Sequence, residues 1–218
     1  MSEIPVLVNE PTAGGASPTF ILAHGAGAGM DHRWMDEMAA ALAEESIRVV
    51  RFEFPYMQEF RMTGKRGRPD PSVVLEETWL RVIEQVGRPG ELFIGGKSMG
   101  GRIASMVADR AGVMGLVCMG YPFHPTGKPS VLRVAHLADL ATPTLILQGE
   151  RDALGTKDEI AGYNLSRSIR VLYLPDGDHS FKPRKSSGHT VGENMSAAVQ
   201  ETAAFCLRRP RPASGEAR

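Results

Sequence analysis

The short segment around Ser98 constrains the fold of this chain more than any other part of the sequence. The apolar run Leu92–Ile94 is typical of a buried parallel strand, and a helical pattern begins directly after Ser98. Glycine stands two residues before and two residues after the serine, at Gly96 and Gly100. In so tight a turn the backbone on the two sides crosses closely, so only small residues fit there. The sequence therefore predicts a strained turn that lifts the Ser98 side chain clear of the sheet, at a helix N-terminus.

Two glycine-containing stretches have other interpretations, and their spacing argues against both. Gly96-Lys97-Ser98 looks like the end of a phosphate-binding loop, but the glycine that this motif requires five residues earlier is Glu91. The stretch from Gly25 to Gly29 follows a predicted strand, as a dinucleotide-binding fingerprint would, but its third required glycine is Met30. We therefore expect neither a nucleotide triphosphate site nor a dinucleotide site.

Length and composition predict a single α/β domain. The domain is expected over residues 1–208, and the polar, proline-containing residues 209–218 are expected to form a flexible tail. The 25 basic and 25 acidic side chains balance, which does not favour a nucleic-acid partner. The sequence has no apolar run of about 20 residues and no signal-peptide pattern. Cys118 and Cys206 fit reduced, buried thiols, so we expect a cytoplasmic protein that does not bind membranes.

Predicted strands and helices alternate along the chain. Strands are expected at 4–8, 19–23, 47–54, 92–94, 114–119, 143–148 and 169–174. Helices are expected from near Asp31, from Asp70-Pro71, after Ser98, over 131–140, and after the capping-box residues Thr156 and Thr190, with a long connection over 55–71. This order predicts a mainly parallel sheet of six to seven strands with helices on both faces, and Pro5 places the first strand at an edge.

Three polar residues follow three different predicted strands, and their chemistry is complementary. A serine hydroxyl needs a neighbouring base to become a nucleophile, and a histidine base needs a carboxylate to orient it. Residues near the expected positions that also fit the acid or the base by type are Glu150, Asp158, His124, His136 and His189. Ser98, Asp152 and His179 stand in the chain order Ser, acid, His that this serine turn requires, each beyond a strand end. We therefore expect these three to form a catalytic triad.

Backbone N–H groups beside Ser98 are the expected donors to a negatively charged oxygen. One is the N–H of Met99, directly after the serine, and the other comes from the loop after the first buried strand. That loop begins His24-Gly25-Ala26, so the second donor is predicted at Gly25 or Ala26. The small residues there let a substrate oxygen approach the backbone.

Taken together, these motifs resemble the α/β-hydrolase superfamily, and within it the small, nearly lidless hydrolases related to dienelactone hydrolases. Four stretches carry the resemblance, namely 24–29, 95–102, 149–152 and 177–181. The resemblance implies an α/β-hydrolase fold with a minimal lid or none, and a reaction without metal or cofactor. Dienelactone hydrolases proper use a cysteine nucleophile, whereas this chain has Ser98, so the same substrate does not follow.

The expected activity is that of a carboxylesterase-like serine hydrolase with a small-molecule ester as substrate. The alternatives are a thioesterase or small peptidase on the same triad, or a non-catalytic interaction protein on this scaffold; the oligomeric state stays open. Only residues 120–142 separate two predicted strands where a lid would enter, so an open site for short acyl groups is expected. A basic loop over 61–68 is a second expected feature, which either attracts anions or is simply solvated. The expected pocket residues are Met30, Tyr56, Met57, Tyr121, Phe123 and Phe181.

Overall fold

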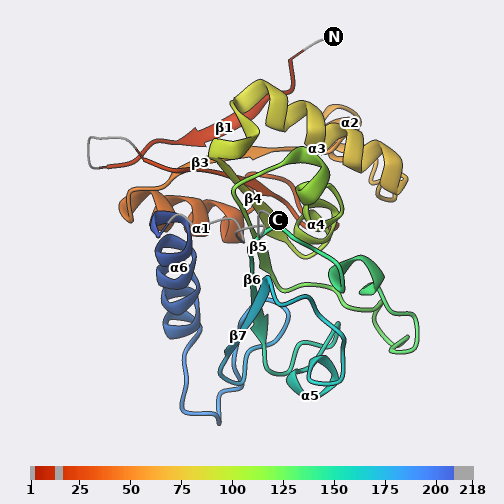
Figure 1. Cartoon of the computed structure of the whole chain (residues 1–218), viewed down its shortest axis with the longest axis vertical. Helices are drawn as coiled ribbons and strands as arrows, with labels where there is room; N and C mark the ends of the chain where they lie inside the picture. The colour runs from red at the N-terminus through yellow and green to blue at the C-terminus, as the bar shows by residue number, and fades with distance from the viewer. Residues whose placement is uncertain (1–2, 13–16, 209–218) are drawn as a thin grey trace, which may run out of the picture.

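A seven-stranded sheet runs through the centre of the molecule in this computed structural model, which describes residues 3–12 and 17–208 (Figure 1). The spatial order of the strands is β1-β3-β2-β4-β5-β6-β7. Only β1 is antiparallel to its neighbour, and all other pairs are parallel. The strands are β1 (Val6–Asn9), β2 (Thr19–Ala23), β3 (Arg48–Phe52), β4 (Leu92–Lys97), β5 (Gly115–Met119), β6 (Thr144–Gly149) and β7 (Ile169–Leu174). The prediction of a mainly parallel sheet with one short edge strand at its N-terminal side is confirmed.

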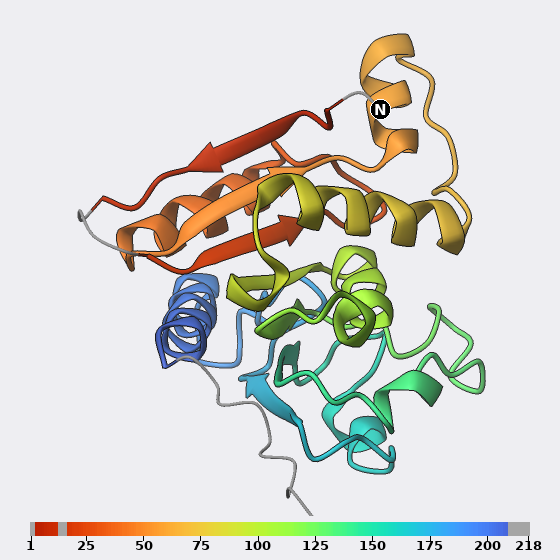
Figure 2. The ribbon, with the colours of Figure 1, turned by 45° about the horizontal axis from the view of Figure 1, so that its top comes forward.

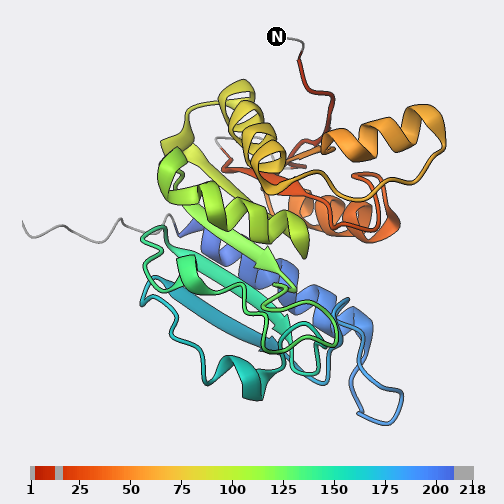
Figure 3. The same cartoon turned by 90° about the vertical axis from the view of Figure 1, so that its right-hand side faces the viewer.

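The helices cover both faces of this sheet (Figures 1 and 2). Helices α1 (Arg33–Glu44) and α6 (Val191–Leu207) pack on one face, where Met38, Leu42 and Ala198 join a buried apolar cluster. Helices α3 (Ser72–Val86) and α4 (Met99–Ala111) cover the other face, which Figure 3 shows in front with α6 behind the sheet. The strands between these layers are buried on both sides, which explains why β4, β5 and β6 lack the alternation of a half-exposed strand.

Two helices begin at the caps that the sequence predicts. The side chain of Thr156 accepts a hydrogen bond from the Glu159 N–H ahead of α5 (Lys157–Ile160), and the Glu159 carboxylate returns one from the Thr156 N–H. The same reciprocal pair, Thr190 and Glu193, precedes α6. Each capping box satisfies backbone donors that have no partner inside the helix.

The connections differ from the sequence prediction in two places. The expected long connection over 55–71 contains a helix, α2 (Pro55–Thr63), because Pro55 starts the helix at its first turn and Gly64 ends it in the left-handed conformation. Asp70 does not cap α3; its carboxylate instead accepts a hydrogen bond from the Tyr56 N–H. Where a helix was expected over 131–140, only a 3-10 turn forms, at Ala135–Leu137.

The segment between β5 and β6 contains no inserted lid, since that 3-10 turn is its only helical element. Cys118 and Cys206 are both buried and unpaired, as expected. Within residues 3–12 and 17–208, no helix is long and apolar enough to cross a membrane. The predicted tail, 209–218, lies outside the described residues.

Candidate active site

The turn between β4 and α4 holds Ser98 in a backbone conformation that side chains rarely adopt. Its φ and ψ angles are 52° and −117°, close to the first central position of a type II′ turn, where glycine predominates. The Ser98 N–H donates to the Met119 carbonyl at 2.9 Å, which anchors the turn to β5. A Cβ on Gly96 would lie 2.5 Å from the Ala23 carbonyl oxygen, and one on Gly100 would lie 2.6 Å from the His24 carbonyl oxygen. The two glycines flanking the serine are therefore required by close backbone contacts.

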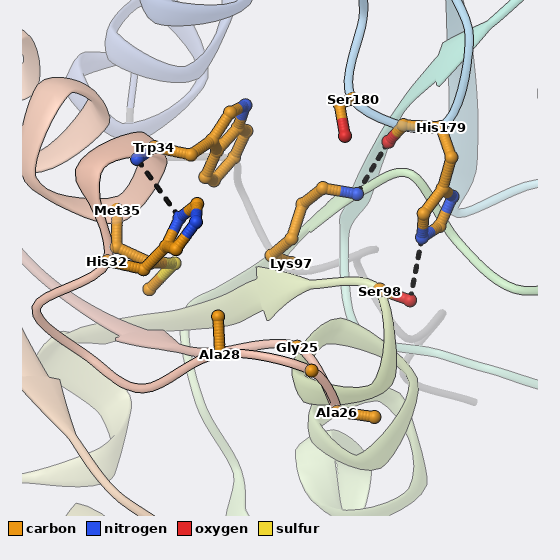
Figure 4. Close-up of a pocket in the computed structure, with 11 residues that line it drawn as sticks. Gly25, Ala26, Ala28, His32, Trp34, Met35, Lys97, Ser98, His179 and Ser180 are labelled. Carbon is orange, nitrogen blue, oxygen red and sulfur yellow. Dashed lines mark hydrogen bonds between the residues drawn. The ribbon is translucent and has the colours of Figure 1, made fainter.

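A chain of hydrogen bonds links the three residues of the predicted triad. The distance from His179 Nε2 to Ser98 Oγ is 2.9 Å, and from His179 Nδ1 to Asp152 Oδ2 it is 2.7 Å. Asp152 is fully buried, whereas the His179 side chain keeps about a third of its surface exposed, enough to face a ligand. The three side chains come from the carboxyl ends of β4, β6 and β7, where ligands bind in sheets of this kind. Figure 4 shows the imidazole above the serine hydroxyl.

The Asp152 carboxylate is held in place by a buried glutamine that the sequence analysis missed. Gln148 Nε2 donates to Asp152 Oδ2 at 2.9 Å, and the Leu154 N–H donates to Asp152 Oδ1 at 2.9 Å. The amide oxygen of Gln148 accepts from the Tyr121 N–H at 2.7 Å, so the same side chain fixes the segment after β5. One signal was available: Gln148 is a polar residue at the end of an otherwise apolar strand. A buried amide in that position needs partners at the strand end.

The loop that carries His179 packs closely against the ends of β5 and β6. A Cβ on Gly149 would lie 2.3 Å from the carbonyl oxygen of Asp178, so this loop can approach β6 only at a glycine. Gly120, at the end of β5, has a φ of 66°, and a Cβ there would lie 3.0 Å from the carbonyl oxygen of His179. These contacts fix the loop and with it the position of the imidazole.

The predicted donor loop lies against the serine. A Cβ on Gly25 would be 3.6 Å from Ser98 Cβ, and neither the Ala26 N–H nor the Met99 N–H has a hydrogen-bond acceptor among the described residues. The buried His24 side chain orients this loop. Its Nε2 accepts a hydrogen bond from the Phe54 N–H at 3.2 Å, so the ring proton is on Nδ1, which donates to the Gly25 carbonyl at 2.7 Å. Burial lowers the pKa of His24, which keeps the imidazole neutral. Among the described residues, the predicted donor N–H groups of Ala26 and Met99 are therefore both without an acceptor.

A cavity of about 280 Å³ opens beside Ser98 (Figure 4). One side is formed by residues 25–28, His32, Trp34 and Met35, from the segment between β2 and α1 and the start of that helix. The other side is formed by the segment Lys97–Ser98 and the segment His179–Ser180. The sequence analysis singled out the glycine-rich part of this wall, but not His32, Trp34 and Met35.

The six residues expected to line this pocket lie elsewhere. All six are buried: Tyr56, Met57, Tyr121, Phe123 and Phe181 belong to the two apolar clusters, and Met30 is buried outside them. Tyr56 nevertheless contacts the loop that lines the cavity, since its hydroxyl donates a hydrogen bond to the Ala26 carbonyl at 3.2 Å. Phe181 stands behind the cavity wall, with its ring centroid 5.8 Å from that of Trp34.

The alternative acids and bases are engaged away from Ser98. Glu150 pairs with Lys157 and accepts from the Asp176 N–H. His136 lies 2.8 Å from the Ser105 hydroxyl. His124 is buried against Glu159, while Asp158 and His189 are exposed.

The basic segment 61–68 is not a free loop at its start. Arg61 lies in the last turn of α2, and its guanidinium pairs with the buried Glu53 and with Asp31. Those carboxylates raise the pKa of Arg61 further above its ordinary value. Arg66 donates to the Gly27 carbonyl and so braces the loop beside the cavity. Both side chains are thus engaged in internal contacts.

Comparison with known proteins places the chain in a family. The family model described as "Alpha/beta hydrolase domain" matches residues 16–207. The chain belongs to the alpha/beta hydrolase family. Its fold is shared by XC6422 from Xanthomonas campestris, described as an a/b serine hydrolase without lid, at 23% identity and a TM-score of 0.66, covering 96% of this chain and 90% of that one.

Two further structures share this alpha/beta hydrolase fold. A dienelactone hydrolase from Anabaena variabilis is 21% identical with a TM-score of 0.67, covering 94% of this chain and 92% of its own. An alpha-beta serine hydrolase homologue from Coxiella burnetii is 21% identical with a TM-score of 0.65, and the match covers 94% of this chain and 91% of that one. At these identities the likeness establishes the architecture but not the reaction.

Proposed function

We propose that this alpha/beta hydrolase cleaves carboxylic esters of short or modest acyl chains by a serine mechanism. The observation that carries the proposal is the hydrogen-bond chain from Ser98 through His179 to the buried Asp152, which opens onto a cavity of about 280 Å³. Both contacts of the imidazole have the length at which a histidine can accept a proton while a carboxylate stabilises the resulting charge.

The first half of the reaction follows from these contacts. Ser98 Oγ attacks the carbonyl carbon of the ester while His179 Nε2 takes the hydroxyl proton, and the Asp152 carboxylate holds the other ring nitrogen. The carbonyl oxygen becomes negatively charged and accepts hydrogen bonds from the N–H groups of Met99 and of Ala26 or Gly25. In measured cases one such donor is worth about 3–4 kcal/mol in the transition state. The imidazolium then protonates the leaving alcohol, and the acyl group stays on Ser98.

Hydrolysis of the acyl-enzyme repeats these steps with water. His179 takes a proton from a water molecule that attacks the acyl carbonyl, and it returns that proton to Ser98 Oγ as the acid leaves. No step requires a metal or a cofactor. The acyl chain fits between residues 25–28 and the side chains of Trp34 and Met35, where the cavity wall is mostly apolar. We place this activity in the cytoplasm and expect a small molecule rather than a nucleic acid or a membrane as its target.

Labelling with a fluorophosphonate probe tests the nucleophile, and turnover of short p-nitrophenyl esters tests the reaction. We expect labelling and turnover in the wild type and in Ser186→Ala, because Ser186 is an exposed serine outside the cavity. Ser98→Ala abolishes both. Asp152→Asn and His179→Ala lower kcat by a factor of roughly 10⁴ while leaving the melting temperature within a few degrees of the wild type.

The alternatives give different results in the same experiments. A non-catalytic interaction protein shows no labelling that depends on Ser98. A thioesterase or small peptidase shows labelling that depends on Ser98 but a higher kcat/KM for thioesters or peptides than for oxygen esters of the same acyl group. Turnover retained in both Asp152→Asn and His179→Ala would mean that other residues activate the serine.

A further inference from the structure

Lys97 places a positive charge in the wall of the cavity beside the nucleophile. It is the last residue of β4 and directly precedes Ser98, and its side chain extends along the cavity between Trp34 and His179 (Figure 4). The proposed mechanism gives this side chain no role. A lysine in this place requires an explanation, because an enclosed ammonium group is costly unless it is paired.

The ammonium group has more donors than the protein satisfies. One N–H donates to the carbonyl oxygen of His179 at 2.5 Å. Nζ also lies 5.7 Å from the centre of the Trp34 ring and 5.8 Å from that of Phe181, at which distance the ring faces attract a cation weakly. Across the described residues, no carboxylate lies within 4 Å of Nζ, so a charged group with three donors is left with one neutral acceptor.

The rest of the cavity lining also lacks negatively charged side chains. Besides Lys97, its titratable side chains are the imidazoles of His32 and His179, and it contains neither an aspartate nor a glutamate. Asp152 and Asp178 act on Lys97 only from outside the lining. Enclosure of the ammonium lowers the pKa of Lys97 to about 8, so the group is still mostly protonated at pH 7 and gains from an anionic partner.

We propose that Lys97 makes this site select esters whose acyl chain ends in a second carboxylate, that is, half-esters of short dicarboxylic acids. The ester carbonyl lies at Ser98 and the distal carboxylate accepts hydrogen bonds from Lys97 Nζ across the cavity. This inference rests on the proposed function and adds its substrate class. The competing explanation is that Lys97 only ties β4 to the His179 loop, in which case the charge of the substrate has no effect.

Matched pairs of substrates separate these explanations. The monoethyl esters of succinic, glutaric and adipic acid are compared with the ethyl esters of the corresponding monoamides, which have nearly the same shape and no charge; released ethanol is measured by NMR. We expect the wild type to prefer the anionic ester for at least one chain length. Lys97→Met lowers the ratio of kcat/KM between the anionic and the neutral ester by about 10- to 100-fold, the range expected for a charge-assisted hydrogen bond.

Two further variants control for charge and folding. Lys182→Met removes an exposed lysine near His179 but outside the cavity lining, and we expect it to leave the ratio unchanged. Lys97→Arg keeps the charge and retains part of the preference. The wild-type ratio itself needs no variant, so the proposal stays testable even if Lys97→Met unfolds.

The pH dependence of the wild-type ratio is a second readout. The ionisable side chains around Lys97 are His32, directly before α1, His179 and Asp178 from the loop after β7, and Asp152 after β6. His179 acts on both esters of a pair in the same way, so its contribution cancels in the ratio. Loss of the Lys97 proton affects only the anionic ester, so the preference declines as the pH rises above about 8.

Binding to the inactive enzyme distinguishes failure of this inference from failure of the proposed function. We expect the free dicarboxylates to bind Ser98→Ala in calorimetry and to bind the Ser98→Ala, Lys97→Met double variant at least 10-fold more weakly. If the wild type hydrolyses both members of every pair equally and Lys97→Met leaves the ratio unchanged, the inference is wrong and the esterase proposal stands. If neither ester is hydrolysed and the fluorophosphonate does not label Ser98, the proposed function is wrong and the inference fails with it.

Discussion

Replacing Ser98 by glycine should give a more stable protein than replacing it by alanine, while both variants lose activity. The backbone at Ser98 has a φ of 52° and a ψ of −117°, and a residue with a Cβ held in such a sparsely populated region costs about 1–3 kcal/mol. Glycine adopts the same angles without that cost, but it loses about 0.5–1 kcal/mol through the greater freedom of the unfolded chain. The balance makes Ser98→Gly more stable than a variant that keeps a Cβ at this position but lacks the hydroxyl, by about 1 kcal/mol.

Ser98→Ala is the matched control for this measurement. Both variants lose the hydroxyl and its 2.9 Å contact with His179, but alanine keeps the Cβ and therefore the strain. The difference between the two variants thus isolates the backbone. For a chain of this size, about 1 kcal/mol corresponds to a melting temperature roughly 2–4 °C higher for Ser98→Gly than for Ser98→Ala.

Urea unfolding of the two variants, with equal m-values, measures this difference directly. A Ser98→Gly protein that is no more stable than Ser98→Ala would refute the reasoning. It would mean either that the turn relaxes around the serine at no cost or that the surrounding contacts, such as the bond to Met119, do not hold it.

Two other predictions concern side chains that support the site. Gln148→Leu leaves the buried Tyr121 N–H unpaired and removes one of the two donors to Asp152 Oδ2, so that only His179 still bonds this oxygen. We therefore expect a loss of at least about 2 kcal/mol in urea unfolding and a lower kcat with little change in KM; a kcat within twofold of the wild type would show that Asp152 needs no such support. Burial lowers the pKa of His24 in the folded protein below its ordinary value of 6.5, so the unfolded chain binds a proton more readily than the folded protein does. The stability that depends on neutral His24 is therefore complete above about pH 6.5. It is lost as the pH falls toward the pKa of His24 in the folded protein, and the free energy of unfolding then drops by up to about 1.4 kcal/mol per pH unit. Urea unfolding between pH 7 and pH 5 should show this slope in the wild type and not in His24→Gln; equal slopes would contradict it.

The sequence predicted the sheet well because each strand was bounded by strong local signals. The strands at Thr19–Ala23 and Ile169–Leu174 have the predicted bounds, since the residues on either side break the apolar run. The helix at Pro55–Thr63 was missed because it buries only Tyr56 and Met57, and because a tertiary contact, the hydrogen bond from the Tyr56 N–H to Asp70, helps to fix its start. A local pattern cannot show a hydrogen bond to a residue fourteen positions further along the chain.

The convergence of Ser98, Asp152 and His179 was predictable because parallel strands bring their carboxyl ends to one edge of the sheet. The cavity wall was not, because it depends on which way each loop side chain turns. Tyr121 and Phe123 follow β5 at the right edge but fold back into the core, whereas Trp34 reaches the cavity from a helix. Spacing along the chain contains no information about that choice.

The chemistry and the shape of this site are supplied by different halves of the sheet. The residues proposed to handle the proton, Asp152 and His179, belong to the segments after β6 and β7, and the apolar side of the cavity belongs to the stretch from Gly25 to Met35 on the opposite side of β4. Exchange of that single stretch therefore offers a way to evolve or engineer acceptance of new acids while the acid–base machinery stays intact.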